Sequence, residues 1–277
     1  MPVFNGDQLR HTTLILLYDE QQVRPDVVSG AMRNLMNCQK QMGMETKEIV
    51  KYAVPGIRDA HQFQKELERI VQKYRGPNNA VNDNMADLFF IMVVNRESDY
   101  KGIKEVFTDL NVLSQCIRRF TCQRMNMSVA SNIMKQINSK LGGESVRIKL
   151  PRFMSASKVM VVGMDVCHAS KNSIVGFVAS TNPACTSFYQ DIICQAKGQE
   201  IVKKDLDRVY GNALEQFRHV NGDYPDKIIV LRDGVGDAMR LQVIENEIKQ
   251  LRTVLDKIIG HDALPKITLV VVNKRIN

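Results

Sequence analysis

Lys158–His168, with the sequence KVMVVGMDVCH, is the stretch that decides the fold of this chain. Its apolar run Val159–Met164 is continuous and rich in valine, which predicts a strand buried on both faces of a sheet. The run ends on an acid, Asp165. A carboxylate at the end of a buried strand is costly unless a metal ion, a base or a salt partner meets it, so Asp165 is a candidate site residue.

A second stretch, Lys227–Asp233 (KIIVLRD), repeats this design, because a β-branched apolar run again closes on an aspartate before a turn signal. If the two strands are neighbours, Asp165 and Asp233 converge at one edge of a sheet. Close carboxylates repel each other unless a cation lies between them, and oxygen ligands favour magnesium or manganese over zinc. For either aspartate alone, capping of the following turn is the better interpretation; for the pair we favour a metal site.

Composition narrows the class of protein. At 277 residues, with 44% apolar and 25% charged residues, the chain is typical of a globular protein with two domains. A net charge of +8 favours an anionic partner, with nucleic acid ahead of a membrane surface. No apolar run is long enough to span a membrane and no secretory signal is evident. The six cysteines lack CxxC spacing, which favours reduced thiols in a protein that is not secreted.

Strands and helices alternate in the first half of the chain, after an expected tail or linker remnant over residues 1–10. Such alternation predicts an open, Rossmann-like α/β sheet whose ligands bind beyond the carboxyl ends of the strands. Polar loops are expected at 78–84 and 95–99. The expected strands are 12–18, 47–53, 87–94 and 114–120, and the expected helices are 27–44, 59–73, one from about 100, and 128–141.

Basic residues accumulate just before the first aspartate strand, and a solvated basic face is a sufficient interpretation for most of them. Tyr100 and Lys104 are one helical turn apart, as are Gln136 and Lys140, so each pair shares a helix face. A phosphate pocket could be formed by Tyr100, Lys104, Gln115 and Lys140. The aromatic ring would stack on a base, and the amide and ammonium groups would bind the oxygens.

The second half of the chain follows a different order, after an expected linker over 149–158. Three antiparallel strands, a helix, a strand that carries an acid, a helix and a strand are typical of a ribonuclease-H-like fold. The expected strands are 159–165, 173–180, 186–193, 227–232 and 267–272, and the expected helices are 200–221 and 237–259.

Several spaced motifs carry a family resemblance. GMDVCH (163–168), GQEIV (198–202) and RDGVGD (232–237) resemble the catalytic segments of PIWI domains in the Argonaute family. QINSKLGGE (136–144) resembles the phosphate-pocket helix of the Piwi clade. The resemblance covers nearly the whole chain. It implies a Rossmann-like MID domain over 11–150 and a ribonuclease-H-like PIWI domain over 151–277 that is incomplete at its C-terminus.

This resemblance implies RNA-guided silencing with a piRNA-type guide, in which Mg²⁺ (or Mn²⁺) supports endonucleolytic cleavage of the complementary target RNA. Asp165 and Asp233 would be catalytic and metal-binding, and Glu200 would be a mobile "glutamate finger". The family's fourth catalytic residue has no counterpart here, and His168 and His261 are interpreted as structural or surface residues. We therefore expect slicing by the full-length parent and no activity in this fragment.

The resemblance also implies which residues bind the 5′ end of the guide. It places Tyr100 on the first base, with Lys104, Gln115 and Lys140 on the 5′ phosphate, and residues 95–99 where the family reads that base. Gln136 stands where the Argonaute clade typically has lysine. Fewer positive charges around the phosphate suggest that a magnesium ion helps to neutralise it.

Two alternatives stay open. One is a guide-binding silencing module that recruits partners without cleaving. The other, more remote, is a stand-alone ribonuclease-H-like nuclease, against which the basic N-terminal half argues. The resemblance implies Tudor-domain and other silencing proteins as partners and residence in cytoplasmic RNA granules or the nucleus, with no membrane association.

Overall fold

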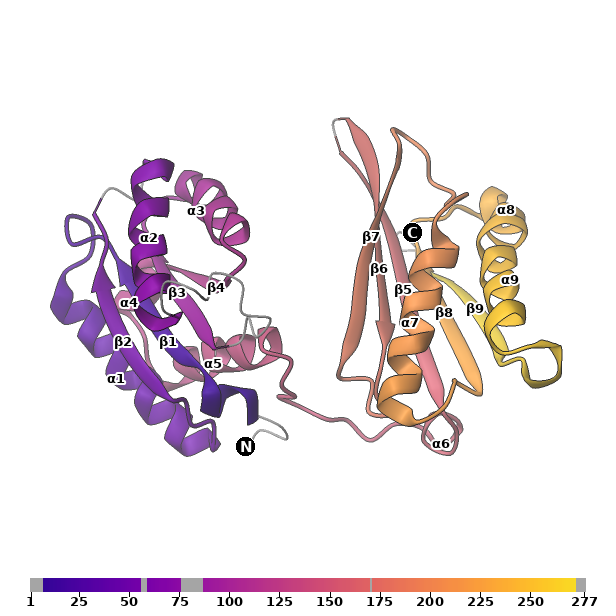
Figure 1. The fold of residues 1–277 in the computed structure, drawn as a ribbon, viewed down its shortest axis with the longest axis horizontal. Coiled ribbons are helices and arrows are strands. Elements are labelled where there is room, and N and C mark those ends of the chain that lie inside the picture. The colour runs from indigo at the N-terminus through magenta and orange to yellow at the C-terminus, as the bar shows by residue number, and fades with distance from the viewer. Residues whose placement is uncertain (1–6, 56–58, 76–86, 170, 273–277) are drawn as a thin grey trace. The chain divides into compact units, whose positions relative to one another are not determined.

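The computed structural model describes residues 7–55, 59–75, 87–169 and 171–272. The chain divides into two compact units, Met1–Val146 and Arg147–Asn277, where the sequence predicts a boundary near residue 150. Figure 1 shows the elements of each unit. Among the described helices, none is both long enough and apolar enough to cross a membrane.

The N-terminal unit is built on a sheet of four parallel strands in the order β2-β1-β3-β4. The strands are β1 (Thr13–Tyr18), β2 (Glu48–Ala53), β3 (Leu88–Val94) and β4 (Leu113–Arg118). Every residue of the two central strands, β1 and β3, is buried, as expected for apolar runs in a parallel sheet that is covered on both faces. The carboxyl ends of β3 and β4 lie side by side, with Val94 opposite Arg118.

Helices cover both faces of this sheet (Figure 1). One core joins α1, α4 and α5 to side chains such as Phe89 and Ile91, and a second core joins α2 and α3 to Phe90 and Met92. The alternation of neighbouring strand residues between the two cores follows from the period of two in a strand. The helices are α1 (Pro25–Met42), α2 (Ala60–Arg75), α3 (Ser98–Asp109), α4 (Arg119–Gln123) and α5 (Met127–Lys140).

Three expectations for this unit need correction. Residues 7–10 are not a tail, because the short helix η1 (Asp7–His11) buries Leu9 completely in the core. The polar loop expected over 95–99 is shorter, since α3 already begins at Ser98. Strand β4 ends at Arg118, and Phe120 belongs to α4. The loop expected over 78–84 lies outside the described residues.

The C-terminal unit has a five-stranded sheet in the order β7-β6-β5-β8-β9. Strands β5, β6 and β7 are antiparallel neighbours, whereas β5, β8 and β9 run parallel. This is the ribonuclease-H-like arrangement that the order of elements predicts. The strands are β5 (Val159–His168), β6 (Asn172–Ser180), β7 (Phe188–Ala196), β8 (Lys227–Asp233) and β9 (Lys266–Val272).

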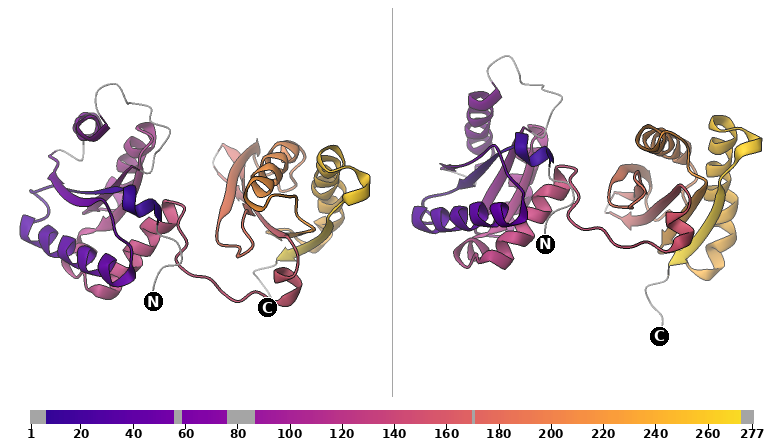
Figure 2. Two further views of the ribbon diagram at one scale, coloured as in Figure 1. Left: turned by 60° about the horizontal axis from the view of Figure 1, so that its bottom comes forward. Right: turned by 90° about the horizontal axis from the view of Figure 1, so that it is seen from below.

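Helices α7 and α9 lie side by side on one face of this sheet (Figure 2). Alternate residues of β5, such as Met160 and Val162, are buried beneath them, while Val161 and Gly163 on the other face are only half-buried. Burial of β5 on both faces is therefore not observed. The helical elements are α6 (Arg152–Ser155), α7 (Leu206–Asn221), η2 (Asp237–Met239), α8 (Arg240–Gln242), the π-helix η3 (Val243–Ile248), α9 (Lys249–Ile258) and η4 (His261–Ala263).

Two expected helices differ from those observed. The helix expected from residue 200 begins only at Leu206, so Glu200 lies in a loop; buried Ile201 and Val202 belong to that loop rather than to a helix face. The helix expected over 237–259 is interrupted by the wider turn of η3, which contains the buried acid Glu247. Both differences occur where the chain approaches the predicted catalytic acids.

Candidate functional site

The strand register brings the two aspartates together. Strands β5 and β8 are parallel neighbours, with Met164 opposite Arg232, so Asp165 and Asp233 follow side by side at the carboxyl ends. Both border an open hollow of about 450 Å³. Because side chains alternate along a strand, Asp165 points to the sheet face opposite the helix-covered Met164. The predicted adjacency of the two strands is confirmed.

A third carboxylate joins them at Gly234, in the turn that follows Asp233. Gly234 has a φ of +83°, a left-handed conformation that favours glycine. A Cβ atom at this position would lie 3.4 Å from Glu200 Oε1 and 3.7 Å from Asp165 Oδ1. Both side chains therefore flank the glycine. We call Asp165, Glu200 and Asp233 together the carboxylate edge.

Arg232 holds Glu200 at this edge and was not predicted as a site residue. Its side chain is fully buried, and it donates from Nη1 to Glu200 Oε1 (3.1 Å) and from Nη2 to the Glu200 carbonyl (2.7 Å). Its Nε lies 3.0 Å from Glu247 Oε2, and Glu247 is also fully buried. Glu247 Oε1 in turn accepts the Val202 N–H at 3.0 Å. A buried ion pair with this many hydrogen bonds fixes the loop on the C-terminal side of Glu200.

His168 contacts the other oxygen of the same carboxylate. Its Nε2 lies 3.2 Å from Glu200 Oε2, and its Nδ1 lies 2.8 Å from Ser173 Oγ. His168 is thus part of the site, a role that its interpretation as a structural or surface residue missed. His261, in contrast, is exposed and pairs with Asp256 at 3.1 Å.

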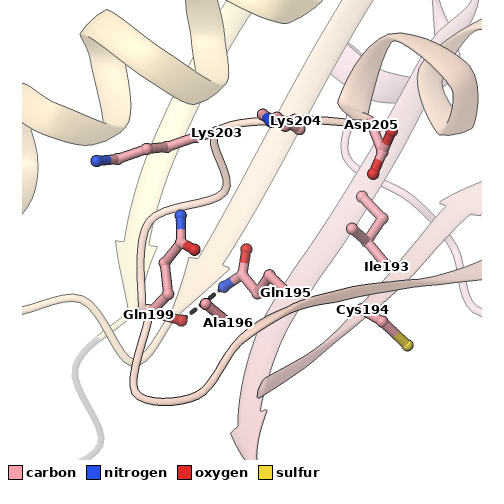
Figure 3. A pocket seen from close by; sticks show the side chains of 8 residues that line it. All are labelled: Ile193, Cys194, Gln195, Ala196, Gln199, Lys203, Lys204 and Asp205. Carbon is pink, nitrogen blue, oxygen red and sulfur yellow. Dashed lines mark hydrogen bonds between the residues drawn. The ribbon is translucent and has the colours of Figure 1, made fainter. Parts of the chain in front are cut away.

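The loop that carries Glu200 is also anchored from β7. Figure 3 shows a second hollow, of about 450 Å³, between the end of β7 and residues 199–205. Gln195 Nε2 donates to the Gln199 carbonyl at 2.6 Å, and Gln199 Nε2 donates to the Ile201 carbonyl at 3.0 Å. Glu200 is therefore positioned by hydrogen bonds on both sides of it. The carboxylate edge does not line this hollow, so we do not assign the catalytic site to it.

Carboxylate oxygens are suitable ligands for a hard divalent cation such as Mg²⁺. Glu200 and Asp165 each place one such oxygen beside Gly234, where the absence of a side chain lets both approach the turn. Within the described residues, however, no three His, Cys, Asp or Glu side chains are already gathered closely enough to hold one. The donor set is appropriate, but the described geometry is not that of an assembled metal centre.

The second candidate site is a cavity of about 380 Å³ at the carboxyl ends of β3 and β4. Open α/β sheets bind ligands at this edge. Tyr100, which is 49% exposed, contributes the aromatic ring of the cavity. We call this site the nucleotide cavity, after the ligand that the sequence predicts for it; it is lined by Val94, Asn95, Arg96, Glu97, Tyr100, Cys116 and Arg118.

Two lysines converge on Ser114, two residues before the cavity residue Cys116. The Ser114 carbonyl accepts Lys140 Nζ at 2.8 Å and Lys104 Nζ at 3.4 Å, and Lys104 also donates to Ser114 Oγ at 2.6 Å. Burial and then the positive charge of Lys104 lower the pKa of Lys140. Burial raises the pKa of the cavity residue Cys116, and both ammonium groups oppose that rise. An anion that binds both lysines would relieve their repulsion.

The two glutamines of the predicted pocket have different positions. Gln115 directs its Nε2 to the Cys116 carbonyl at 3.1 Å, whereas Gln136 is exposed on α5, one turn before Lys140. In the part of the chain that the structure describes, Lys104 and Lys140 have no carboxylate within salt-bridge distance. The structure thus brings the lysines together, near Tyr100, without neutralising them.

Comparisons with known proteins agree with this geometry. A family model described as the Piwi domain matches residues 87–277. The chain is 29% identical to Piwi-like protein 1 of Gallus gallus over 269 residues, which are 95% of this chain and 29% of that protein. It spans less than a third of the length of the curated relatives it matches.

Two solved structures share the fold. The MID-PIWI domains of N. crassa QDE-2 AGO are similar with a TM-score of 0.79 and 22% identity, over 98% of this chain and 76% of that one. Kluyveromyces polysporus Argonaute with a guide RNA is similar with a TM-score of 0.75 and 19% identity, over 98% of this chain and 34% of that one.

Proposed function

Because this chain belongs to the Piwi-domain family of Argonaute proteins, we propose that it binds a small guide RNA, of the piRNA type, for RNA-guided silencing. In this proposal the N-terminal unit is a MID domain and the C-terminal unit is a PIWI domain. The observation that carries it is the convergence of Lys104 and Lys140 on one carbonyl beside the nucleotide cavity.

In the proposed guide complex, the nucleotide cavity receives the first base and Tyr100 stacks on it. The two ammonium groups turn from the Ser114 carbonyl to the 5′ phosphate. Each then makes a charge-assisted hydrogen bond that is stronger than its bond to a neutral carbonyl. The amides of Gln115 and Gln136 add donors without charge, and a magnesium ion would supply the remaining neutralisation.

We further propose that the carboxylate edge supports cleavage of the target RNA. Asp165 and Asp233 would hold Mg²⁺ (or Mn²⁺), which when bound supplies an activated water and stabilises charge on the scissile phosphate. Arg232 and His168 hold one oxygen each of Glu200, which keeps that carboxylate beside Asp165. The target strand, paired with the guide, would be recognised by base pairing, and the protein would contact mainly its backbone.

A second candidate is a module that binds guide and target without cutting. It is favoured by one observation: among the described residues, no three potential ligands are close enough together to hold a metal ion. The two candidates make the same prediction for guide binding and differ only in the fate of the target.

Guide-directed target capture tests the proposal. The chain is loaded with a 5′-phosphorylated guide RNA and mixed with a labelled complementary target or a scrambled one, in magnesium or in EDTA. Retention of the complementary target alone is the expected result, and equal retention of both targets would contradict the proposal. The fate of the target is tested in the full-length parent, where a magnesium-dependent cut that Asp165→Asn abolishes without loss of capture supports cleavage, whereas an intact captured target supports the second candidate.

A further inference from the structure

We propose that Ser173 is a positioning residue that sets the tautomer of His168 and, through it, the orientation of Glu200. Its relevance to catalysis rests on the proposed role of Glu200, whereas the tautomer itself does not. The Ser173 hydroxyl, the His168 ring and the Glu200 carboxylate form a chain of contacts in which each hydrogen needs an acceptor.

The hydroxyl of Ser173 has a single hydrogen to donate. Ser173 is fully buried in β6, and its Oγ already accepts the N–H of Gly198 at 2.9 Å. Among the described residues, the other partner within reach is Nδ1 of His168, at 2.8 Å. A buried hydroxyl whose hydrogen has no acceptor is unfavourable, so Ser173 donates to Nδ1, which must then be the unprotonated nitrogen of the ring.

The other nitrogen of the ring leads to the same assignment. His168 Nε2 lies 3.2 Å from Glu200 Oε2. With the proton on Nε2, the ring donates to the carboxylate. With the proton on Nδ1, a nitrogen lone pair would face a negatively charged oxygen and the Ser173 hydrogen would have no acceptor. The hydrogen bonds therefore all run one way, from Gly198 through Ser173 and His168 to Glu200.

Ser173 thus controls the glutamate loop at two points. It binds the backbone at Gly198, where the chain turns with a φ of +76°, two residues before Glu200. It also orients the ring that holds Glu200 Oε2, while Arg232 holds Oε1. With a donor on each oxygen, the carboxylate is held beside Asp165, where the proposed reaction requires it.

Nitrogen NMR of the RNA-free chain determines the tautomer of His168 directly. The chain contains five histidines, and long-range ¹H–¹⁵N spectra at about pH 8.5 show which nitrogens of each ring carry a proton. The His168 signals are those lost in His168→Gln. We expect a ring protonated only on Nε2. A ring protonated on Nδ1, on both nitrogens or in a mixture of tautomers would overturn the proposal.

Two substitutions separate the influence of Ser173 from that of the carboxylate. In Glu200→Gln the neighbouring amide can donate or accept, so it no longer favours either tautomer; we expect the Nε2-protonated form to persist because Ser173 is still present. Adding Ser173→Ala should then produce a mixture, and Ser173→Thr, which keeps the hydroxyl, should not. A mixture in Glu200→Gln alone would show that the carboxylate sets the tautomer and would refute the role of Ser173.

Unchanged signals from His61 and His219 serve as the control for folding. If Ser173→Ala does not fold, the wild-type and Glu200→Gln spectra still decide the question. No RNA is present in this experiment, so its outcome is independent of guide binding. Failure of target capture with the expected tautomer would count against the proposed function alone.

Discussion

The nucleotide cavity and the carboxylate edge occupy equivalent places, at the carboxyl ends of parallel strands, but their charges are arranged differently. Next to the cavity, Lys104 and Lys140 repel each other and share a neutral carbonyl. At the carboxylate edge, Glu200 already has Arg232 and His168 as partners. The lysines therefore gain from an anionic ligand, whereas Glu200 is held in place before any ligand arrives.

Because of this difference, we expect substitutions next to the nucleotide cavity to change RNA binding, and substitutions around Glu200 to change the folding stability of the C-terminal unit. The Arg232–Glu247 pair is completely buried, so its loss should be felt in the folding of the C-terminal unit. Neither Lys104 nor Lys140 is fully buried, and their removal should be felt in RNA binding. Substitutions at each site, with matched controls, should distinguish the effect on folding from the effect on RNA binding.

Arg232→Met should destabilise the C-terminal unit by about 3–5 kcal/mol, because it leaves the Glu247 carboxylate buried without its partner. Urea unfolding, followed by the circular dichroism of the chain, measures this loss. Arg208→Met is the matched control: the Arg208–Asp191 pair is at the surface, so its loss should cost no more than about 1 kcal/mol. Equal losses in the two variants would contradict the structural role of Arg232.

Lys104→Met should weaken binding of a 5′-phosphorylated RNA by roughly 10- to 100-fold, the equivalent of about 1.5–3 kcal/mol for a hydrogen bond to a charged group. Fluorescence anisotropy with a labelled guide measures the Kd. Lys101→Met is the control, since Lys101 lies on the same helix but is exposed and pairs with Glu105. If both variants weaken binding equally, the effect is one of general charge and not of a pocket.

Asp165→Asn should weaken the binding of Mn²⁺ to the chain by about tenfold, near 1.4 kcal/mol, because it removes one of the two proposed carboxylate ligands. The electron paramagnetic resonance signal of free Mn²⁺ measures the affinity. Asp237→Asn, which changes an exposed acid paired with Arg240, should leave it unchanged. An unaltered affinity in Asp165→Asn would place the metal elsewhere.

The preference for a 5′ phosphate should fall as pH rises from 7.5 to 9.5, by about threefold. Burial and Lys104 lower the pKa of Lys140, so it loses its proton at a lower pH than an ordinary lysine, and the phosphate loses a charged partner. Because the phosphate favours the protonated form, binding in this range takes up protons. Kd values for phosphorylated and hydroxyl RNA across the range measure the effect, and Lys140→Met should show no such dependence.

The sequence was sufficient to predict the two strands that carry Asp165 and Asp233, because a buried apolar run and the acid that follows it are local features. It did not predict that β5 continues beyond Asp165 to His168. It was also sufficient to predict that Tyr100 lies at the carboxyl ends of parallel strands, whereas Lys104 and Lys140 meet at Ser114, near the amino end of β4. These residues keep the spacing of regular elements, and the sheet edge follows from the alternation of strands and helices.

The hydrogen-bonding partners of Glu200 were not predicted. The sequence predicted a helix from residue 200, yet the burial of Ile201 and Val202 reflects a loop that is tied to residues distant in the chain. One feature of the sequence indicated that Arg232 faces the core: the alternation of side chains along β8 places it on the same face as Val230. Its partner Glu247 lies in a π-helix, an element that hydrophobic spacing does not reveal.

The central claim is that the nucleotide cavity recognises a 5′ phosphate, and one pair of binding isotherms tests it most directly. The wild-type chain is titrated, in magnesium, with one RNA sequence that carries either a 5′ phosphate or a 5′ hydroxyl. We predict a Kd at least about tenfold lower for the phosphorylated RNA, from the two ammonium groups beside the cavity. Equal affinity for the two RNAs would contradict the assignment of Lys104 and Lys140 to the 5′ phosphate.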